Sequence, residues 1–237
     1  MRSVGYGRTS RHRRVVRFLV SVGVITSITA VRIGGRARII EIDGHAWRTT
    51  SAATVRLAGI KEGDVVSLET LQEQLDEAER QALRDRALAV LGYRERSVSE
   101  LRSKLLEDGY PSESVASTVS AFERSGLVDD ERFAESVARS AAGLRAIGRR
   151  RAERDLASRG VSDEIAAAAL DMYIPAEGEH ARAVALARRL RKPDERVDRL
   201  AARLVRKGYA PFVAFEAARE ALSDVQDDGT LDEYPDI

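Results

Sequence analysis

Arginine is the residue type with the clearest chemistry in this sequence of 237 residues, since only four of its 39 basic residues are lysines. The planar guanidinium group binds phosphates and carboxylates through two parallel hydrogen bonds, which a lysine ammonium cannot do. A coding bias towards arginine codons would explain the ratio equally well. The positions of the arginines therefore carry more information than their number.

The sharpest arginine pattern lies in the segment 196–207. With about 100° of rotation per residue, five basic side chains fall within an arc of about 100°, opposite the apolar Leu204. The segment 149–156 carries four arginines that face away from Leu156, and another basic cluster lies at 188–192. We expect these faces to bind a partner or phosphates through Arg149, Arg150, Arg151, Arg154, Arg188, Arg189, Arg196, Arg199, Arg203, Arg206 and Lys207. The alternative is that they are solvated helix faces, partly neutralised by neighbouring acidic residues.

Residue types that usually carry out catalysis or hold metals are scarce. The chain has no cysteine, which excludes disulfides, zinc ribbons, iron–sulfur clusters and thiol nucleophiles. Its three histidines are widely spaced, and neither a G-x-x-x-x-G-K-[ST] phosphate loop nor a G-x-S-x-G nucleophile motif occurs. We expect His45 on a strand surface and His180 on a helix face. The sequence therefore predicts no catalytic residues, no metal site and no cofactor.

Helices must position the arginine faces, and three of the expected helices share one pattern. Two apolar residues are spaced four apart, and a glycine follows after four more. The copies are Leu101, Leu105 and Gly109; Ala152, Leu156 and Gly160; and Leu200, Leu204 and Gly208. Each copy predicts a helix with one buried row, ended by a glycine in a left-handed conformation. A short helix follows each copy, so the sequence predicts tandem three-helix repeats, with the glycine-ended helix second, in an elongated curved array.

Six successive regions are predicted along the chain. They are a basic disordered leader at 1–23, a small β-rich module at 24–68, a linking helix and first repeat at 69–128, repeats at 129–176 and 177–222, and an acidic disordered tail at 223–237. Helix starts are expected at Ser97, Pro111, Asp129, Ser162, Pro193 and Pro211.

The β-rich module is expected to contain hairpins. Turns at Gly34-Gly35 and Asp43-Gly44 separate alternating segments, the last of them around Trp47. A short helix at 50–57, a strand at 65–68 and a long helix from about 68 to 91 should follow.

The net charge of +1 conceals two ends of opposite sign. The first 40 residues contain nine arginines and no acidic residue, whereas the last fifteen contain six acidic residues and no basic one.

The apolar run at 18–25 resembles the core of a signal peptide, but no small-residue cleavage site follows it. No stretch reaches the roughly 18 apolar residues of a membrane span. We therefore expect a cytoplasmic protein without membrane contact, whose leader is a basic arm or reflects a translation start placed too early.

Several short motifs run through the first two repeats. They are Arg94-x-Arg96-Ser97-x-x-Glu100-Leu101, Gly126-x-Val128-Asp129-Asp130-x-x-Phe133-Ala134, Gly148-Arg149-Arg150 and Asp155-Leu156-x-x-x-Gly160. In these motifs, residues 80–222 resemble the RecX family of bacterial recombination regulators, and 24–79 resemble more weakly a β-rich extension of some members. The resemblance implies tandem three-helix repeats, no catalytic activity, and binding to the RecA recombinase filament on single-stranded DNA. It also implies that the protein dampens the ATPase and strand exchange of RecA, in DNA repair and the SOS response.

Three functions remain open at the level of sequence. The first is a monomeric regulator that binds the filament, through DNA phosphates or acidic recombinase surface, with weak direct binding to DNA. The second is a stand-alone helical DNA-binding protein, which the scarcity of glutamine for reading bases disfavours. The third is an enzyme, whose acidic residues and histidines would have to converge from separate helices.

Overall fold

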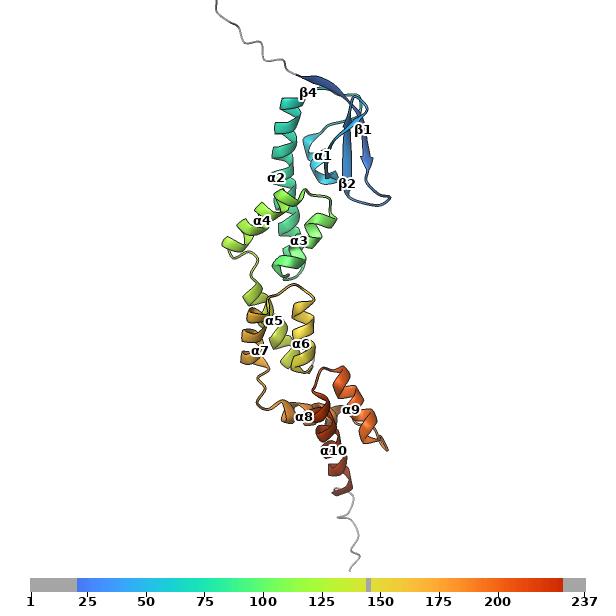
Figure 1. The fold of residues 1–237 in the computed structure, drawn as a ribbon, viewed down its shortest axis with the longest axis vertical. Helices are drawn as coiled ribbons and strands as arrows, with labels where there is room; N and C mark the ends of the chain where they lie inside the picture. The colour runs from blue at the N-terminus through green and yellow to red at the C-terminus, as the bar shows by residue number, and fades with distance from the viewer. Residues whose placement is uncertain (1–20, 144–145, 228–237) are drawn as a thin grey trace, which may run out of the picture.

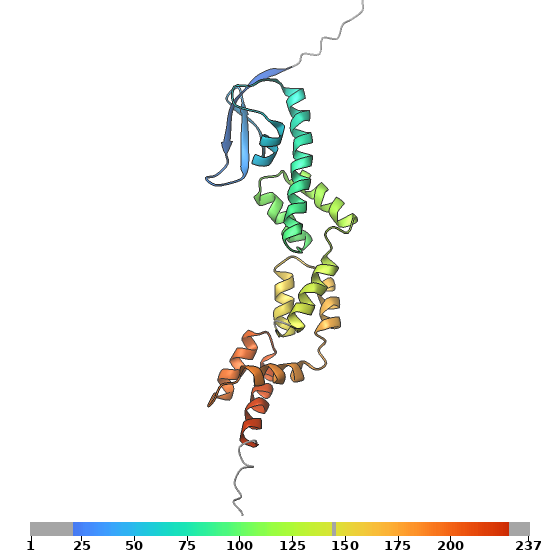
Figure 2. The ribbon, with the colours of Figure 1, turned by 180° about the vertical axis from the view of Figure 1, so that it is seen from behind.

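The computed structural model describes residues 21–143 and 146–227, and the side chains of this range up to Ser223. A small sheet at one end is followed by helices in an elongated, curved array (Figure 1), and the view from behind shows the same row (Figure 2). The strands are β1 (Val22–Ala30), β2 (Ala37–Ile42), β3 (His45–Ser51) and β4 (Val65–Ser67). The helices are α1 (Ala52–Ala58), α2 (Leu68–Tyr93), α3 (Val98–Glu107), α4 (Ser112–Arg124), α5 (Asp130–Ala142), α6 (Arg149–Ala157), α7 (Asp163–Tyr173), α8 (Glu179–Leu190), α9 (Val197–Arg206) and α10 (Pro211–Asp227). The predicted fold class, mainly α with a small β-rich N-terminal module, is confirmed.

The N-terminal sheet has the strand order β3-β2-β1-β4, and each neighbouring pair is antiparallel. In the turn between β2 and β3, Asp43 has a φ of 52° and Gly44 a φ of 79°. Two successive residues at positive φ match the right-handed twist of a hairpin. Ile25 and Ile40 point into a core that the sheet shares with α1 and α2. Both predicted hairpins are therefore confirmed.

Three predicted boundaries differ from the structure. β1 begins at Val22, inside the predicted leader, because its first residues pair with β4. α1 begins at Ala52, since Thr50 and Ser51 still pair with β2. α10 continues to Asp227, past the predicted end of the last repeat at 222. The rest of the predicted leader and tail, 1–20 and 228–237, lies outside the described residues.

Helix α2 links the sheet to the rest of the molecule. Leu75 lies in the core under the sheet, whereas Leu83 and Val90 belong to the core of the first three-helix unit. One continuous helix of 26 residues thus contributes to two cores. In the part of the chain that the structure describes, no helix is long and apolar enough to cross a membrane.

Three units, α2–α4, α5–α7 and α8–α10, each enclose a separate hydrophobic core. In every unit the second helix is followed by a glycine at positive φ, which is 91° at Gly109, 75° at Gly160 and 99° at Gly208. This conformation is easy for glycine and strained for other residues. The glycine-ended helix is therefore second in each unit, as the sequence predicts.

One expected helix start is wrong, because α9 begins at Val197 and not near Pro193. Pro193 lies in a turn where the amide of Glu195 donates to the carbonyl of Lys192, and Asp194 has a φ of 54°. Because this hydrogen bond pairs backbone groups within the turn, the helix begins only after it. The other expected starts are confirmed at Ser97, Pro111, Asp129, Ser162 and Pro211.

The second helices of the three units meet end to end. Where α9 ends, the carbonyl of Lys207 accepts a hydrogen bond of 2.9 Å from the amide of Gly148, which precedes α6. Where α6 ends, the carbonyl of Arg159 accepts one of 2.5 Å from the hydroxyl of Ser97, which precedes α3. The line α9–α6–α3 follows one side of the array in both views (Figures 1 and 2). Each helix C-terminus adjoins the next N-terminus, an arrangement that helix dipoles favour.

The junction between α9 and α6 has room for no side chain at Gly148. A Cβ atom there would lie 2.5 Å from the backbone carbonyl carbon and oxygen of Gly208. We expect Gly148→Ala to destabilise the protein by about 1–3 kcal/mol, because two backbones must separate. Urea unfolding measures this loss. The control is Gly92→Ala in α2, where a Cβ meets nothing within 4 Å and alanine should be neutral or stabilising. Equal stability of the two variants would contradict a tight junction.

Candidate basic interface

The arginines of α6 differ in how they are held. Arg149 pairs with Glu153 at 3.0 Å and with Asp171 of α7 at 2.6 Å. Burial acts to lower the pKa of Arg149, but the hydrogen bonds that it donates to these carboxylates raise the pKa above its ordinary value. Arg149 therefore ties α6 to α7. In contrast, Arg150 and Arg154 are exposed, and their side chains form no ion pair or hydrogen bond among the described residues.

Two arginines of α9 are available to bind a partner in the same way as Arg150 and Arg154. Arg199 and Arg206 are exposed, and neither side chain is paired within the described part of the chain. Leu200 and Leu204 of the same helix are fully buried, so α9 separates an apolar face from a basic one. The carbonyl of Arg206 also accepts a hydrogen bond of 3.3 Å from Nη1 of Arg151, which places the start of α6 beside the end of α9.

The other predicted members of the α9 face are either paired with a carboxylate or half-buried. Arg203 donates two hydrogen bonds of 3.0 Å to Glu195, whose side chain is only 8 % exposed. Arg196 pairs with Asp198 at 3.1 Å, but both side chains are exposed, so this pair contributes little. Lys207 is half-buried at the junction. Of the predicted arc of five basic residues, Arg199 and Arg206 are therefore the two that are both exposed and unpaired within the described structure.

The cluster at 188–192 lies at the C-terminal end of another helix, α8. Arg188 of α8 pairs with Glu220 of α10 at 3.5 Å, and Arg189 is exposed. Arg191 donates a hydrogen bond of 2.7 Å to the carbonyl of Ala221. Arg188 and Arg191 join α8 to α10, and the cluster stands outside the line α9–α6–α3.

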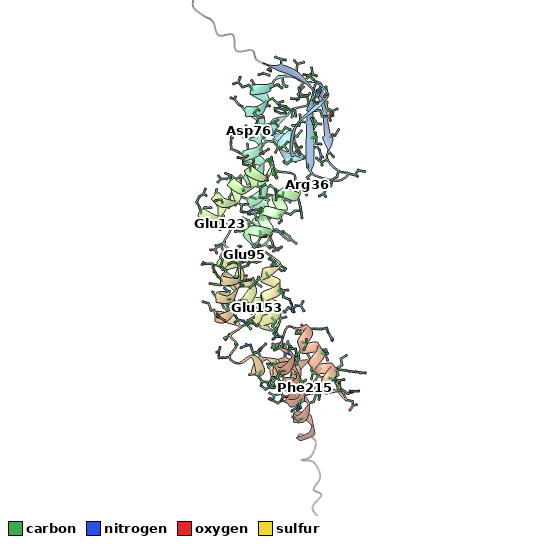
Figure 3. All side chains as sticks on the ribbon, viewed as in Figure 1. Arg36, Asp76, Glu95, Glu123, Glu153 and Phe215 are labelled. Carbon is green, nitrogen blue, oxygen red and sulfur yellow. The ribbon has the colours of Figure 1, made fainter. Side chains whose placement is uncertain are left out.

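Four residues make up what we call the basic strip: Arg150 and Arg154 of α6, and Arg199 and Arg206 of α9. Because α9 and α6 meet end to end, the strip spans the junction between the second and third units. Figure 3 shows nitrogen-tipped side chains extending from α9 into solvent. Unpaired guanidinium groups in such a position can bind phosphate or carboxylate oxygens.

Sequence reasoning missed an ionic cluster where α6 meets α3. Glu100 accepts two hydrogen bonds of 3.0 Å from Arg94 and lies 3.5 Å from Arg159. Burial acts to raise the pKa of Glu100, but both arginines hold it below its ordinary value. Arg159 also lies over the ring of Phe133, 5.7 Å from its centroid. The nearness of Arg94 to Glu100 in sequence is a weak local signal, whereas Arg159 is brought in by the packing of the second unit.

Comparisons with known proteins match the units described above. A family model for the first three-helix domain of RecX matches residues 84–120, and one for the second three-helix domain matches 129–170. The chain is 33 % identical over 165 residues to the regulatory protein RecX of Mycolicibacterium vanbaalenii, covering 64 % of this chain and 89 % of that protein. It is 32 % identical over 174 residues to the regulatory protein RecX of Corynebacterium efficiens, covering 69 % of this chain and 81 % of that one.

The fold is similar as well. The crystal structure of a regulatory protein RecX has a TM-score of 0.53 to this chain at 22 % identity, and the match covers 84 % of this chain and 99 % of the other. Since relatives at 32–33 % identity are matched over most of their length, and the two domain models fall on consecutive units, the chain belongs to the RecX family of regulatory proteins.

Proposed function

We propose that this protein binds the filament of a RecA recombinase on single-stranded DNA and slows its ATP hydrolysis and strand exchange, in DNA repair and the SOS response. Membership of a family of regulatory proteins supports the proposal. The observation that carries it is the line of second helices, which bears unpaired arginines across the junction of two units. Regulation by binding needs no catalytic residue of its own.

An elongated array of repeats suits a long partner. Each unit contacts only its neighbours, so such arrays present an extended surface along which many weak contacts add up. A nucleoprotein filament offers negative charge over a comparable length, from DNA phosphates and from carboxylates of the recombinase. The guanidinium groups of the basic strip bind either kind of oxygen.

The proposal is tested by the ATPase rate of the recombinase on single-stranded DNA. We expect a several-fold lower steady-state rate when this protein is present at near-equal or lower amounts. A DNA-dependent ATPase of another family serves as the control and should not respond. An unchanged recombinase rate at saturating protein would exclude the proposed function.

The basic strip also supports a second candidate, a stand-alone DNA-binding protein. Direct binding to DNA through phosphates alone should weaken steeply with added salt and show no preference for sequence. Tight, sequence-specific binding to naked DNA, together with an unaffected ATPase, would favour this second candidate.

A further inference from the structure

A polar cavity of about 330 Å³ lies where α6 meets α3. Three serines line it: Ser99 and Ser103 from α3, and Ser158 from the end of α6. The hydroxyl of Ser158 donates to the carbonyl of Asp155 at 2.9 Å. The hydroxyls of Ser99 and Ser103 form no hydrogen bond among the described residues, so both are free to donate to a ligand.

The charges around this cavity do not cancel. Its two carboxylates are already bound, Glu100 by Arg94 and Arg159, and Glu107 by Lys104 at 3.0 Å. Arg96 also lines the cavity and has no carboxylate partner in the described part of the chain. Three of the residues that line the cavity are basic, Arg96, Lys104 and Arg159, and two are acidic, so the lining carries one positive charge in excess.

Arg96 also has an unmet hydrogen-bonding requirement. Its Nε–H group is buried and meets no acceptor within the described structure. Buried donors in native proteins are nearly always paired, and those that are not call for an explanation such as a functional role or a bound ion. Arg96 therefore lines the cavity with a guanidinium group that has no carboxylate partner and one donor without an acceptor in the described structure.

We propose that the cavity binds a phosphate group of a single-stranded nucleic acid backbone, with Arg96 as the charged donor and Ser99 and Ser103 as hydroxyl donors. Guanidinium and hydroxyl groups are common partners of backbone phosphates. The cavity lies at the C-terminal end of α6, and the last turn of this helix carries Arg154 of the basic strip, so the site extends the basic strip to the first unit. This proposal concerns phosphate recognition and does not depend on the recombinase.

Salt dependence of binding tests the role of Arg96. Affinity for a labelled oligothymidylate is measured by fluorescence anisotropy over a range of salt concentrations. Loss of one phosphate contact should make the slope of log K against log salt shallower by about 0.7 in Arg96→Gln. Arg96→Lys, which keeps the charge, should retain most of the slope. Arg32→Gln, in the loop before β2, removes an exposed charge far from the cavity and should also retain it. A slope in Arg96→Gln equal to that of the wild type overturns the site.

A second variant avoids altering a partly buried arginine. Ser103 is exposed on α3, so Ser103→Glu places a carboxylate in the cavity without disturbing the core. We expect oligothymidylate to bind roughly tenfold more weakly, whereas Ser117→Glu on α4, a matched change of an exposed serine, should have little effect. Equal weakening in both variants would mean that only net charge matters, and would overturn the proposal.

The Arg96 Nε–H signal in a nitrogen–proton NMR spectrum identifies the ligand directly. A shift of this signal on adding oligothymidylate, but not on adding inorganic phosphate at the same concentration, supports a backbone phosphate. A shift of equal size with inorganic phosphate alone overturns the nucleic acid part of the proposal. The absence of any shift overturns the site altogether. A negative ATPase experiment would leave these measurements unaffected, so failures of the two proposals are distinguishable.

Discussion

Glutamate in place of Arg150, Arg154 and Arg199 is expected to weaken binding to the recombinase filament about 100-fold or more. A hydrogen bond to a charged group contributes about 1.5–3 kcal/mol, and about 1.4 kcal/mol corresponds to a factor of ten. The change replaces attraction with repulsion at three positions. Since none of the three side chains is paired among the described residues, the described structure loses no ion pair and no hydrogen bond. The measurement is filament affinity, with circular dichroism as the check that helices are retained.

The matched control for this triple variant reverses three other exposed and unpaired arginines. Arg32, Arg56 and Arg84 lie near the sheet and on α2, away from the line of second helices. Their replacement by glutamate changes the net charge equally and should weaken binding far less. If both triple variants bind equally weakly, long-range charge explains the effect and the basic strip has no special role. Arg203 is unsuitable for this experiment, because its loss would leave the buried Glu195 unpaired.

Among the substitutions proposed for this protein, Asp108→Ala is expected to lower the free energy of unfolding the most. Asp108 is buried at the end of α3, where its carboxylate lies 2.6 Å from Nε of Arg86 and 3.3 Å from Nη1 of Arg36. It thereby joins α3 to α2 and to the start of the sheet's second strand. The carboxylate is buried, but Arg86 and Arg36 are 29 % and 60 % exposed, so water solvates them once the carboxylate is gone. The lost charged hydrogen bonds lead us to expect that Asp108→Ala costs about 2–4 kcal/mol.

The free energy of unfolding in urea checks this expectation. Asp85→Ala removes an exposed carboxylate on α2 and should change stability by less than about 0.5 kcal/mol. Asp108→Asn keeps the size and part of the hydrogen bonding, so it should fall between the two. A cost for Asp108→Ala no greater than that for Asp85→Ala would show that the cluster contributes nothing to joining the sheet to the first unit.

Local features of the fold could be read from the sequence because they depend on neighbouring residues. The side chains of Ser97, Asp129 and Ser162 each accept an amide hydrogen bond from three residues ahead, as capping predicts. The Asp43-Gly44 turn depends on backbone preferences of just those two residues. The expected helix start at Pro193 is wrong because the residues around it form a turn, in which the amide of Glu195 donates to the carbonyl of Lys192.

The sequence by itself thus determined the repeat, the helices and the side of each helix that carries arginine, because these follow from a period of 3.6 residues. Only the tertiary structure decided which arginines are available. Asp171 binds Arg149 from another helix, and Glu195 binds Arg203 from the turn before α9. The same holds for the cavity at Arg96, which exists because two units meet end to end. A periodic pattern contains no information about which distant residues packing will bring together, and that packing separates structural arginines from those left to bind a partner.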